Sequence, residues 1–312
     1  MGKPVVLKNL SKRFSSPHNP QESCLVVDRI NLELKEGELL TMVGPRGCGK
    51  STILKMIAGL EHPTEGEIYV DGQMVEGIPP KARKVGFLVP ENPLFEHMTV
   101  ADNISFGFDI RNTPNKERRR RFEQLVTIMG LEDVLDRSPD QLSQAQQRRV
   151  ALARTLAPEP RVLLLDDPFA GLDTAARQQL RADTMLWQRE LKIPTILATH
   201  DRFEALEMGG RIAVLGEGRF QQIDSSRNLF SKPANAFVAN FIGDGTMLPG
   251  ASSNRLNGAI GTIDAGLPGQ AGDLFAPPID GQQREEDDQV ESAMASNTFL
   301  GRPIRFEVGR HI

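Results

Sequence analysis

The segment Gly44-Pro45-Arg46-Gly47-Cys48-Gly49-Lys50-Ser51-Thr52 sets the architecture of this chain. It fits the pattern G-x-x-x-x-G-K-[ST], whose fixed positions are Gly44, Gly49, Lys50 and Ser51. In such a loop the glycines let successive backbone N–H groups point at phosphate oxygens, and the lysine reaches the terminal phosphates. The pattern therefore favours a site for a nucleoside triphosphate over a glycine-rich turn that binds nothing.

The sequence on either side gives this loop a strand–loop–helix context. The apolar run Leu39–Val43 predicts a buried strand before the loop, and the amphipathic stretch Thr52–Leu60 predicts a helix after it. A helix that begins at the loop directs its positive dipole end at the phosphates. In this setting we expect the Ser51 hydroxyl to hold Mg²⁺.

Composition and charge narrow the class of protein. The 312 residues suggest one large domain with something smaller, and the net charge of −4 gives no reason to expect a nucleic-acid partner. No apolar run approaches the ~18 residues that span a bilayer. The N-terminus lacks the layout of a signal peptide, so we expect the chain to stay in the cytoplasm. Cys24 and Cys48 are too few for a disulfide framework or a zinc site, and Cys48 is expected to be a small filler of the loop.

The N-terminal part of the chain predicts strands. Val5–Leu10 and Leu25–Leu34 alternate apolar and polar residues, and residues 66–75 give a strand–turn–strand pattern around Asp71-Gly72. Phe14 has two interpretations, an ordinary core residue or an aromatic ring that stacks on adenine, and composition alone does not choose between them.

A largely helical section follows. Val100–Phe106 comes after a threonine that can cap it, and Lys116–Met129 has apolar residues at helical spacing. The basic run Arg118–Arg121 is expected to be a solvated face rather than a contact for membrane or nucleic acid. Ser143 is predicted to cap a long helix, Gln144–Leu156, which the following prolines end.

Continuous apolar runs alternate with these helices, at 85–89, 162–165 and 193–198. Such runs indicate a parallel sheet covered on both faces, with ligands at the carboxyl ends of its strands. Asp166 and Asp167 follow one run, and His200 follows another. The two carboxylates have two interpretations: a cap for the next helix, or an Mg²⁺-holding Asp166 beside an acid that positions or activates water.

The C-terminal part changes character. Pro233–Ile242 predicts one more helix, and the remaining residues are rich in Gly, Pro and Ala with an acidic run at Glu285–Asp288. Short strand-like pieces occur at Thr298–Leu300 and Ile304–Val308. We expect a weakly β or partly disordered appendage.

From Val5 to Ile242 the chain resembles the ATP-binding subunits of ABC transporters, most of all bacterial importers of the iron, polyamine and sugar type. The phosphate loop, Leu142–Arg154, Arg161–Asp173 and His200 occur in the order and spacing of that family. The resemblance implies an α/β fold with a P-loop NTPase core: a mostly parallel sheet with flanking helices and an antiparallel β portion near the N-terminus.

The resemblance also implies a domain plan. Residues 1–242 would form the ATP-binding domain, with a helical subdomain at about 99–157. Residues 243–312 would be a partial or truncated regulatory β appendage of the TOBE type.

Site residues carry over from the family by position. The resemblance implies that Asp167 and His200 are catalytic, with His200 as a switch histidine that contacts the γ-phosphate. It also implies that Ser51 and Asp166 hold Mg²⁺. The residues implied to bind ATP are Phe14 through adenine stacking, the whole loop Gly44–Thr52, and Ser143, Gln146 and Asp173 across a subunit interface.

Family members act in pairs, and each ATP lies between one subunit's phosphate loop and its partner's signature sequence. The implied partners are a second ATP-binding subunit (identical or different), an integral membrane permease, and indirectly a solute-binding protein. The implied location is peripheral, on the cytoplasmic face of the cell membrane.

The chain departs from the family pattern at four places. The signature Leu-Ser-Gly-Gly-Gln is replaced by Leu142–Gln146, in which Gln144 is bulky where little room is expected. Pro90 replaces a glutamine that helps hold Mg²⁺ and the attacking water. Asp167 replaces a glutamate and is shorter by one methylene, and ~1 Å of misplacement can cost roughly 100-fold in rate. Arg46 replaces a small residue, and it either adds charge at the γ-phosphate or crowds the interface.

Two functional hypotheses follow. The first is a subunit that couples MgATP hydrolysis to solute import through a permease, with slow turnover because of the altered motifs. The alternative is a nucleotide-binding regulatory or structural subunit with little ATPase activity of its own, paired with a catalytically intact partner.

Overall fold

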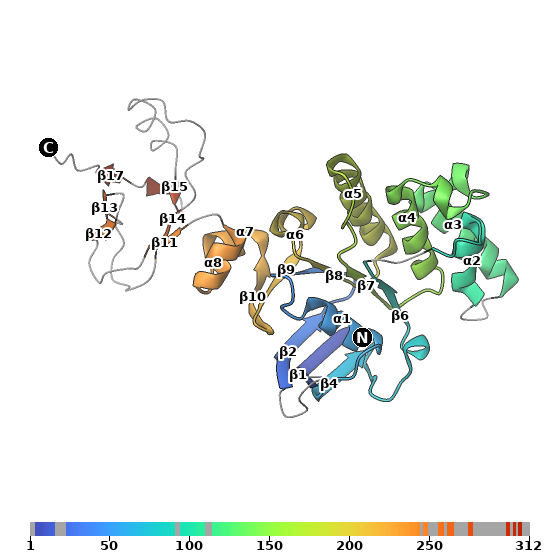
Figure 1. Ribbon diagram of the computed structural model, residues 1–312, viewed down its shortest axis with the longest axis horizontal. Helices are drawn as coiled ribbons and strands as arrows, with labels where there is room; N and C mark the ends of the chain where they lie inside the picture. Colours follow the sequence, from blue (N-terminus) through green and yellow to red (C-terminus); the bar gives the residue numbers. More distant parts are fainter. Residues whose placement is uncertain are drawn as a thin grey trace. The chain divides into compact units, whose positions relative to one another are not determined.

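The computed structural model describes residues 4–15, 23–90, 94–109 and 114–243, and short strands between residues 246 and 307 (Figure 1). By contact density the chain divides into two compact units, Met1–Ser226 and Arg227–Ile312. The acidic run Glu285–Asp288 lies outside the described residues. In the described part, no helix is both long and apolar enough to cross a membrane.

An antiparallel sheet forms the N-terminal portion of the first unit. Its strands, in the order β2-β1-β4-β5, are β1 (Val5–Ser15), β2 (Ser23–Leu34), β4 (Glu65–Val70) and β5 (Gln73–Met74). The turn between β4 and β5 has positive φ at both Asp71 (51°) and Gly72 (76°), as a tight hairpin requires. The predicted antiparallel portion and its Asp-Gly turn are confirmed.

A second sheet of six strands carries the phosphate loop. Its order is β10-β9-β3-β8-β7-β6. The strands are β3 (Leu39–Val43), β6 (Val85–Leu88), β7 (Val162–Asp166), β8 (Thr195–Thr199), β9 (Arg211–Gly216) and β10 (Arg219–Ser225). All neighbours pair in parallel except β9 and β10. The mostly parallel sheet expected from the apolar runs is confirmed, whereas the antiparallel edge strand β10 was not predicted.

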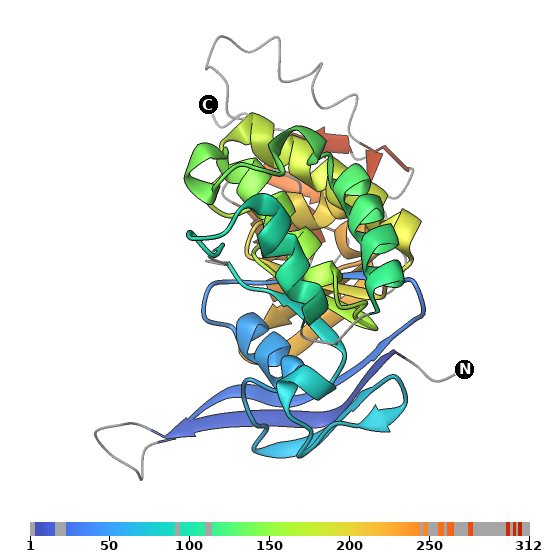
Figure 2. The same cartoon turned by 90° about the vertical axis from the view of Figure 1, so that its right-hand side faces the viewer.

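Helices lie on both faces of this sheet (Figure 2). They are α1 (Lys50–Ala58), α2 (Val100–Asp109), α3 (Asn115–Met129), α4 (Gln144–Leu156), α5 (Thr174–Leu191) and α6 (Arg202–Met208), with 3₁₀ turns at Pro80–Ala82, Glu132–Val134 and Pro139–Gln141. Because β7 is buried on both faces, its side chains alternate between two cores. Leu163 and Leu165 pack in one core with α2–α4, and Val162 and Leu164 pack in the other with α1 and the antiparallel sheet.

Helix capping follows the sequence closely. The Thr99 hydroxyl accepts a hydrogen bond from the Asp102 amide at 3.1 Å and so caps α2. Ser143 caps α4 in a reciprocal box with Gln146, as its position before Gln144 predicted. Arg83 caps the C-terminal end of α1, because its buried guanidinium donates to the carbonyl oxygens of Met56 and Ile57.

The second unit begins close to α7 (Ser226–Ser231) and contains α8 (Ala236–Ile242), which Asn235 caps. Short antiparallel strands follow: β11 (Thr246–Leu248), β12 (Arg255–Gly258), β13 (Gly261–Asp264), β14 (Leu274–Ala276), β15 (Thr298–Phe299), β16 (Arg302–Pro303) and β17 (Arg305–Glu307). Strands β15 and β17 fall within the two strand-like pieces predicted there. The predicted domain boundary at residues 242/243 stays a prediction.

Candidate nucleotide-binding site

The loop Gly44–Thr52 joins β3 to α1, and its outer glycines are fixed by close backbone packing. A Cβ on Gly44 would lie 2.1 Å from the Leu215 carbonyl oxygen. Gly49 has φ +108°, and a Cβ there would lie 2.8 Å from the Val26 carbonyl oxygen. Only glycine fits these two positions, so the loop is held tightly between two neighbouring backbones.

The ammonium group of Lys50 lies under this loop. Its Nζ donates to the carbonyl oxygens of Gly44 at 2.7 Å and Pro45 at 2.8 Å. The Cys48 Sγ is 3.5 Å from the same nitrogen, and Cys48 is buried, in keeping with a small filler of the loop. The lysine cation is therefore buried against carbonyl oxygens of the loop itself.

Ser51 and Asp166 join the loop to the carboxyl end of β7. The Ser51 hydroxyl donates to the Asp166 carboxylate at 3.0 Å. Burial raises the pKa of Asp166 above its usual range, and the Ser51 hydrogen bond opposes that shift. Two hard oxygen donors fit Mg²⁺, which characteristically takes one or two protein ligands and completes its shell with phosphate oxygens and water. In the described part of the chain, no group of three or more His, Cys, Asp or Glu side chains is placed to hold a metal ion.

Asp167 and His200 meet at the same edge of the sheet. His200 Nδ1 lies 2.9 Å from the Asp167 carboxylate, and the Asp167 amide donates to the Ala198 carbonyl at 2.8 Å. Asp167 has φ +47°, a left-handed conformation that aspartate tolerates better than glutamate. The interpretation of this acidic pair as a helix cap is wrong, because Asp173 caps the following helix α5.

Arg46 connects the phosphate loop to this acid–imidazole pair. Its Nη2 lies 3.3 Å from His200 Nε2, across 154 positions of sequence. A guanidinium only donates, so Nε2 accepts in this contact and the ring hydrogen lies on Nδ1, which donates to Asp167. The site thus has a continuous series of hydrogen bonds from Arg46 through His200 to Asp167.

Comparisons with known proteins agree with this geometry. The family model described as ABC transporter matches residues 27–170. The chain is also 38% identical over 285 residues to the spermidine/putrescine import ATP-binding protein PotA of Oleidesulfovibrio alaskensis, covering 91% of this chain and 73% of that protein. The chain belongs to the ABC transporter family.

Other members of the ABC transporter family give the same result. Identity is 42% over 243 residues to a probable sulfate/thiosulfate import ATP-binding protein CysA of Chlorella vulgaris (77% of this chain, 98% of that protein). It is 42% over 227 residues to the trehalose/maltose import ATP-binding protein MalK of Thermococcus litoralis (71% of this chain, 61% of that protein). The expected resemblance to import ATP-binding subunits is confirmed.

Solved ABC structures share the fold. A dimeric ATP-binding cassette in a post-hydrolysis state, bound to ADP and Pi, matches with a TM-score of 0.62 and 31% identity over 71% of this chain and 98% of that one. A component of an ABC transporter complex from Clostridium perfringens matches with a TM-score of 0.65 and 29% identity over 75% of this chain and 93% of that one. The expected α/β P-loop fold is confirmed.

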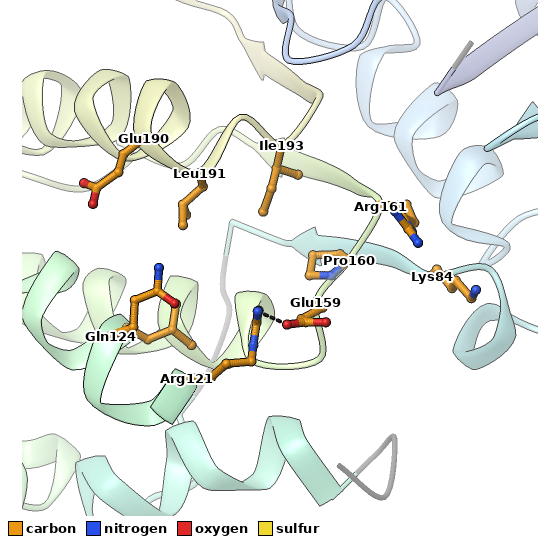
Figure 3. Close-up of a pocket in the computed structure, with 10 residues that line it drawn as sticks. Lys84, Arg121, Gln124, Glu159, Pro160, Arg161, Glu190, Leu191 and Ile193 are labelled. Atoms are coloured by element: carbon orange, nitrogen blue, oxygen red, sulfur yellow. Dashed lines mark hydrogen bonds and ion pairs between the residues drawn. The ribbon is translucent and has the colours of Figure 1, made fainter. Parts of the chain in front are cut away.

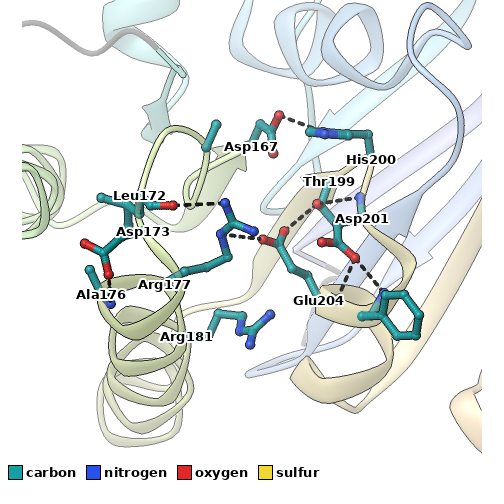
Figure 4. A network of polar contacts seen from close by, with 12 residues as sticks. Asp167, Leu172, Asp173, Ala176, Arg177, Arg181, Thr199, His200, Asp201 and Glu204 are labelled. Atoms are coloured by element: carbon teal, nitrogen blue, oxygen red, sulfur yellow. Dashed lines mark hydrogen bonds and ion pairs between the residues drawn. The ribbon is translucent and has the colours of Figure 1, made fainter.

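A buried polar network behind His200 was missed by sequence reasoning in this ABC chain (Figure 4). The Thr199 hydroxyl donates to the buried Glu204 carboxylate at 2.6 Å. Arg177 lies 3.8 Å from the other Glu204 oxygen and donates to the Leu172 carbonyl at 3.0 Å. Glu204 in the first turn of a helix suggests a favourable dipole contact, but its burial comes from elements distant in sequence.

Arg148 of α4 was also missed. It donates to the Ala170 carbonyl at 3.4 Å. Burial lowers the pKa of Arg148, and the negative charge of Asp167 opposes that shift. Helix α4 therefore supplies a positive charge, on Arg148, that interacts electrostatically with the Asp167 carboxylate.

The buried Glu204 predicts a pH-dependent stability. Burial raises the pKa of Glu204, so the folded chain holds that proton more tightly than the unfolded chain. The free energy of unfolding is therefore expected to fall as pH rises through the folded-state pKa. Glu204→Gln keeps an acceptor for Thr199 and removes the titration, so its urea midpoint should decline less between pH 5 and 8. Glu207→Gln changes an exposed side chain on the same helix and should keep the wild-type dependence of the urea midpoint on pH. An equal decline of the midpoint in all three proteins would contradict the prediction.

Four predicted site residues lie apart from this cluster. Phe14 is 38% exposed, with the Lys12 ammonium 4.8 Å from its ring centroid, so its interpretation as a core residue is wrong. Ser143 and Gln146 bond each other at the start of α4, and Asp173 accepts from the Ala176 amide at 3.0 Å. Within the described residues, none of the four hydrogen-bonds to the phosphate loop. Their predicted roles at an ABC dimer interface stay predictions.

A cavity of about 550 Å³ lies elsewhere on the first unit (Figure 3). Its lining includes Lys84, Arg161 and Ile193, which come just before β6, β7 and β8. It therefore opens at the amino ends of these parallel strands, opposite the edge that carries the phosphate loop. The candidate nucleotide site, with the loop and its carboxylates, therefore lies at the other end of these strands from the cavity.

Proposed function

We propose that this chain is the ATP-hydrolysing subunit of an importer, which couples MgATP binding and hydrolysis to solute passage through a membrane permease. The observation that carries the proposal is the pairing of His200 with Asp167 beside the Ser51–Asp166 contact. A phosphate-binding loop, a metal-compatible oxygen pair and an oriented carboxylate meet at one sheet edge. Membership of a family of import ATP-binding subunits supports the same function.

ATP would enter at the loop and meet positive groups already in place. Backbone N–H groups of Gly44–Thr52 and the start of α1 would bind the β- and γ-phosphates, with Lys50 turning from its carbonyl partners to them. Ser51 and Asp166 would hold Mg²⁺, which supplies positive charge to the phosphate oxygens when bound. The exposed ring of Phe14 would stack on adenine.

Hydrolysis needs one water molecule and one base. In our proposal the Asp167 carboxylate takes a proton from that water while the water oxygen forms a bond to the γ-phosphorus. The bond from the γ-phosphorus to the bridging oxygen breaks, and ADP leaves with the electron pair. His200 holds Asp167 in place through its Nδ1–H. Because aspartate is shorter than glutamate, we expect slow turnover.

The site would be completed by a second ATP-binding subunit. A matched solved cassette is a dimer bound to ADP and Pi, which supports pairing. Ser143 and Gln146 lie at the exposed start of α4, where they are available to another subunit's nucleotide. Asp173 would belong to the same interface. The permease would contact the helical section near 99–141, at the cytoplasmic face of the membrane.

The solute is set by other subunits in this proposal. The relatives import chemically different solutes: polyamines, sulfate or thiosulfate, and sugars. Identity to all three groups lies near 40%, so similarity of this subunit does not select among them. We assign solute choice to the permease and to any solute-binding protein.

Single-turnover and steady-state ATPase measurements test the proposed function. The purified chain should bind MgATP alone and hydrolyse it when assembled with its permease. Tight ATP binding with no turnover in the full complex would overturn the proposal in favour of a regulatory or structural subunit.

Restoring two family residues should raise turnover. Pro90 has no side-chain amide to hold water, and Gln144 places a long exposed side chain at the first residue of α4. Pro90→Gln combined with Gln144→Gly is expected to raise steady-state ATPase by about tenfold, because small misplacements of reacting groups cost roughly 100-fold. Ala145→Gly, a milder change in the same segment, is the matched control and should alter turnover by less than about twofold. No gain from the double variant would show that other departures limit the rate.

A further inference from the structure

Arg46 is the residue of Gly44–Thr52 whose cationic side chain reaches out of the loop. It is exposed, and its guanidinium contacts His200 Nε2 at 3.3 Å, whereas the Lys50 ammonium is turned inward to the loop carbonyls. A Cβ on the neighbouring Gly47 would meet no atom within 4 Å. The space beside the loop next to Arg46 is therefore open at Gly47.

The contact with Arg46 changes what His200 can do. Its Nδ1–H is committed to Asp167, and its Nε2 lone pair accepts from Arg46. A phosphate oxygen is an acceptor, so it cannot bind to that lone pair. Arg46 keeps further N–H donors in a rigid fork after one of them is used on His200. The donor that faces an incoming phosphate is thus the guanidinium and not the imidazole.

We propose that Arg46 is a catalytic residue that binds the γ-phosphate directly, and that His200 is the positioning residue that holds Arg46 and Asp167 in register. This inference rests on the proposed function and deepens it. An arginine that binds the transferring phosphoryl group stabilises the charge that develops as the bond to the bridging oxygen breaks. Here the arginine comes from the phosphate loop itself.

Binding of triphosphate and diphosphate nucleotides tests the assignment without relying on hydrolysis. The full chain and its Arg46→Ala and Arg46→Lys variants are titrated with the non-hydrolysed analogue AMP-PNP and with ADP, both with Mg²⁺. Arg46→Ala should lose about tenfold or more in AMP-PNP affinity and change ADP affinity by less than about twofold. Arg46→Lys should lie between, because lysine keeps the charge without the fork.

Arg119→Ala is the matched control, an exposed arginine of α3 that pairs with Glu123 of the same helix. It should alter neither affinity. Equal losses for AMP-PNP and ADP in Arg46→Ala would overturn the proposal, because they indicate general attraction rather than a γ-phosphate contact. An unchanged or raised AMP-PNP affinity would also overturn it and would show that Arg46 crowds the site.

A double-mutant cycle tests the positioning role of His200. His200→Ala should weaken AMP-PNP binding in the wild-type background and have much less effect in the Arg46→Ala background. Equal effects in both backgrounds would mean that His200 contacts the phosphate independently, which contradicts the proposal. If the permease complex proves inactive, the proposed function fails while the difference between AMP-PNP and ADP still decides the role of Arg46.

Discussion

Asp167→Asn is expected to lower the steady-state ATPase turnover of the chain with its permease by about 100-fold or more, while the Kd for ATP changes by less than about threefold. The amide keeps the size of the side chain and cannot take a proton from water. The amide also gives His200 Nδ1 a neutral acceptor in place of the Asp167 carboxylate, whose oxygen lies 2.9 Å from that nitrogen in the wild-type chain. Turnover and nucleotide affinity are measured on the same preparations, so lost chemistry is separated from lost binding.

Two companion variants sharpen this test. Glu36→Gln removes an exposed carboxylate in the turn before β3, outside the section proposed to contact the permease, and should leave turnover unchanged. Asp167→Glu keeps a base with longer reach and should retain measurable turnover, at some cost in stability because residue 167 has φ +47°. Full activity in Asp167→Asn would exclude its carboxylate as the base.

Gly44→Ala is expected to remove most nucleotide binding and to destabilise the fold. The new Cβ would lie 2.1 Å from the Leu215 carbonyl oxygen and 2.9 Å from Cys48 Sγ, so the end of β3 or the neighbouring β9 must move. Overpacking of this kind costs about 3 kcal/mol. If two hydrogen bonds from loop N–H groups to a charged phosphate are lost, affinity should fall by at least about 100-fold. Calorimetric titration with ADP and urea unfolding measure the two effects.

Gly47→Ala provides the matched control in the same loop. No atom lies within 4 Å of its added Cβ, and the strain at φ +79° should cost about 1–2 kcal/mol. ADP affinity should therefore fall by less than about tenfold. If both alanine variants lose the same affinity, close packing at Gly44 is not what shapes the loop.

Local patterns in the sequence were sufficient for much of the fold. The Asp71-Gly72 turn, the Ser143 cap and the buried strand at 162–165 depend on neighbouring residues and side-chain periodicity, which a sequence displays directly. The carboxyl-edge placement of Asp166 and Asp167 followed from the parallel sheet.

Contacts between distant elements could not be predicted in the same way. The Arg46–His200 contact joins residues 154 positions apart, and it depends on side-chain conformations at the ends of two strands. The burial of Glu204 depends on Thr199 and on Arg177 from another helix. The left-handed backbone at Asp167, which favours aspartate over glutamate there, has no signature in the residues around it.

The buried contact between Arg177 and Glu204 has a mechanical consequence for a two-subunit machine. Arg177 holds the Leu172 carbonyl on one side, and Glu204 holds Thr199, next to His200, on the other. The loop that precedes α5 and the turn that carries His200 are therefore connected through the Arg177–Glu204 contact. If the proposed second subunit contacts residues 171–173, we expect a shift of that loop to be passed through Arg177 and Glu204 toward the turn that carries His200.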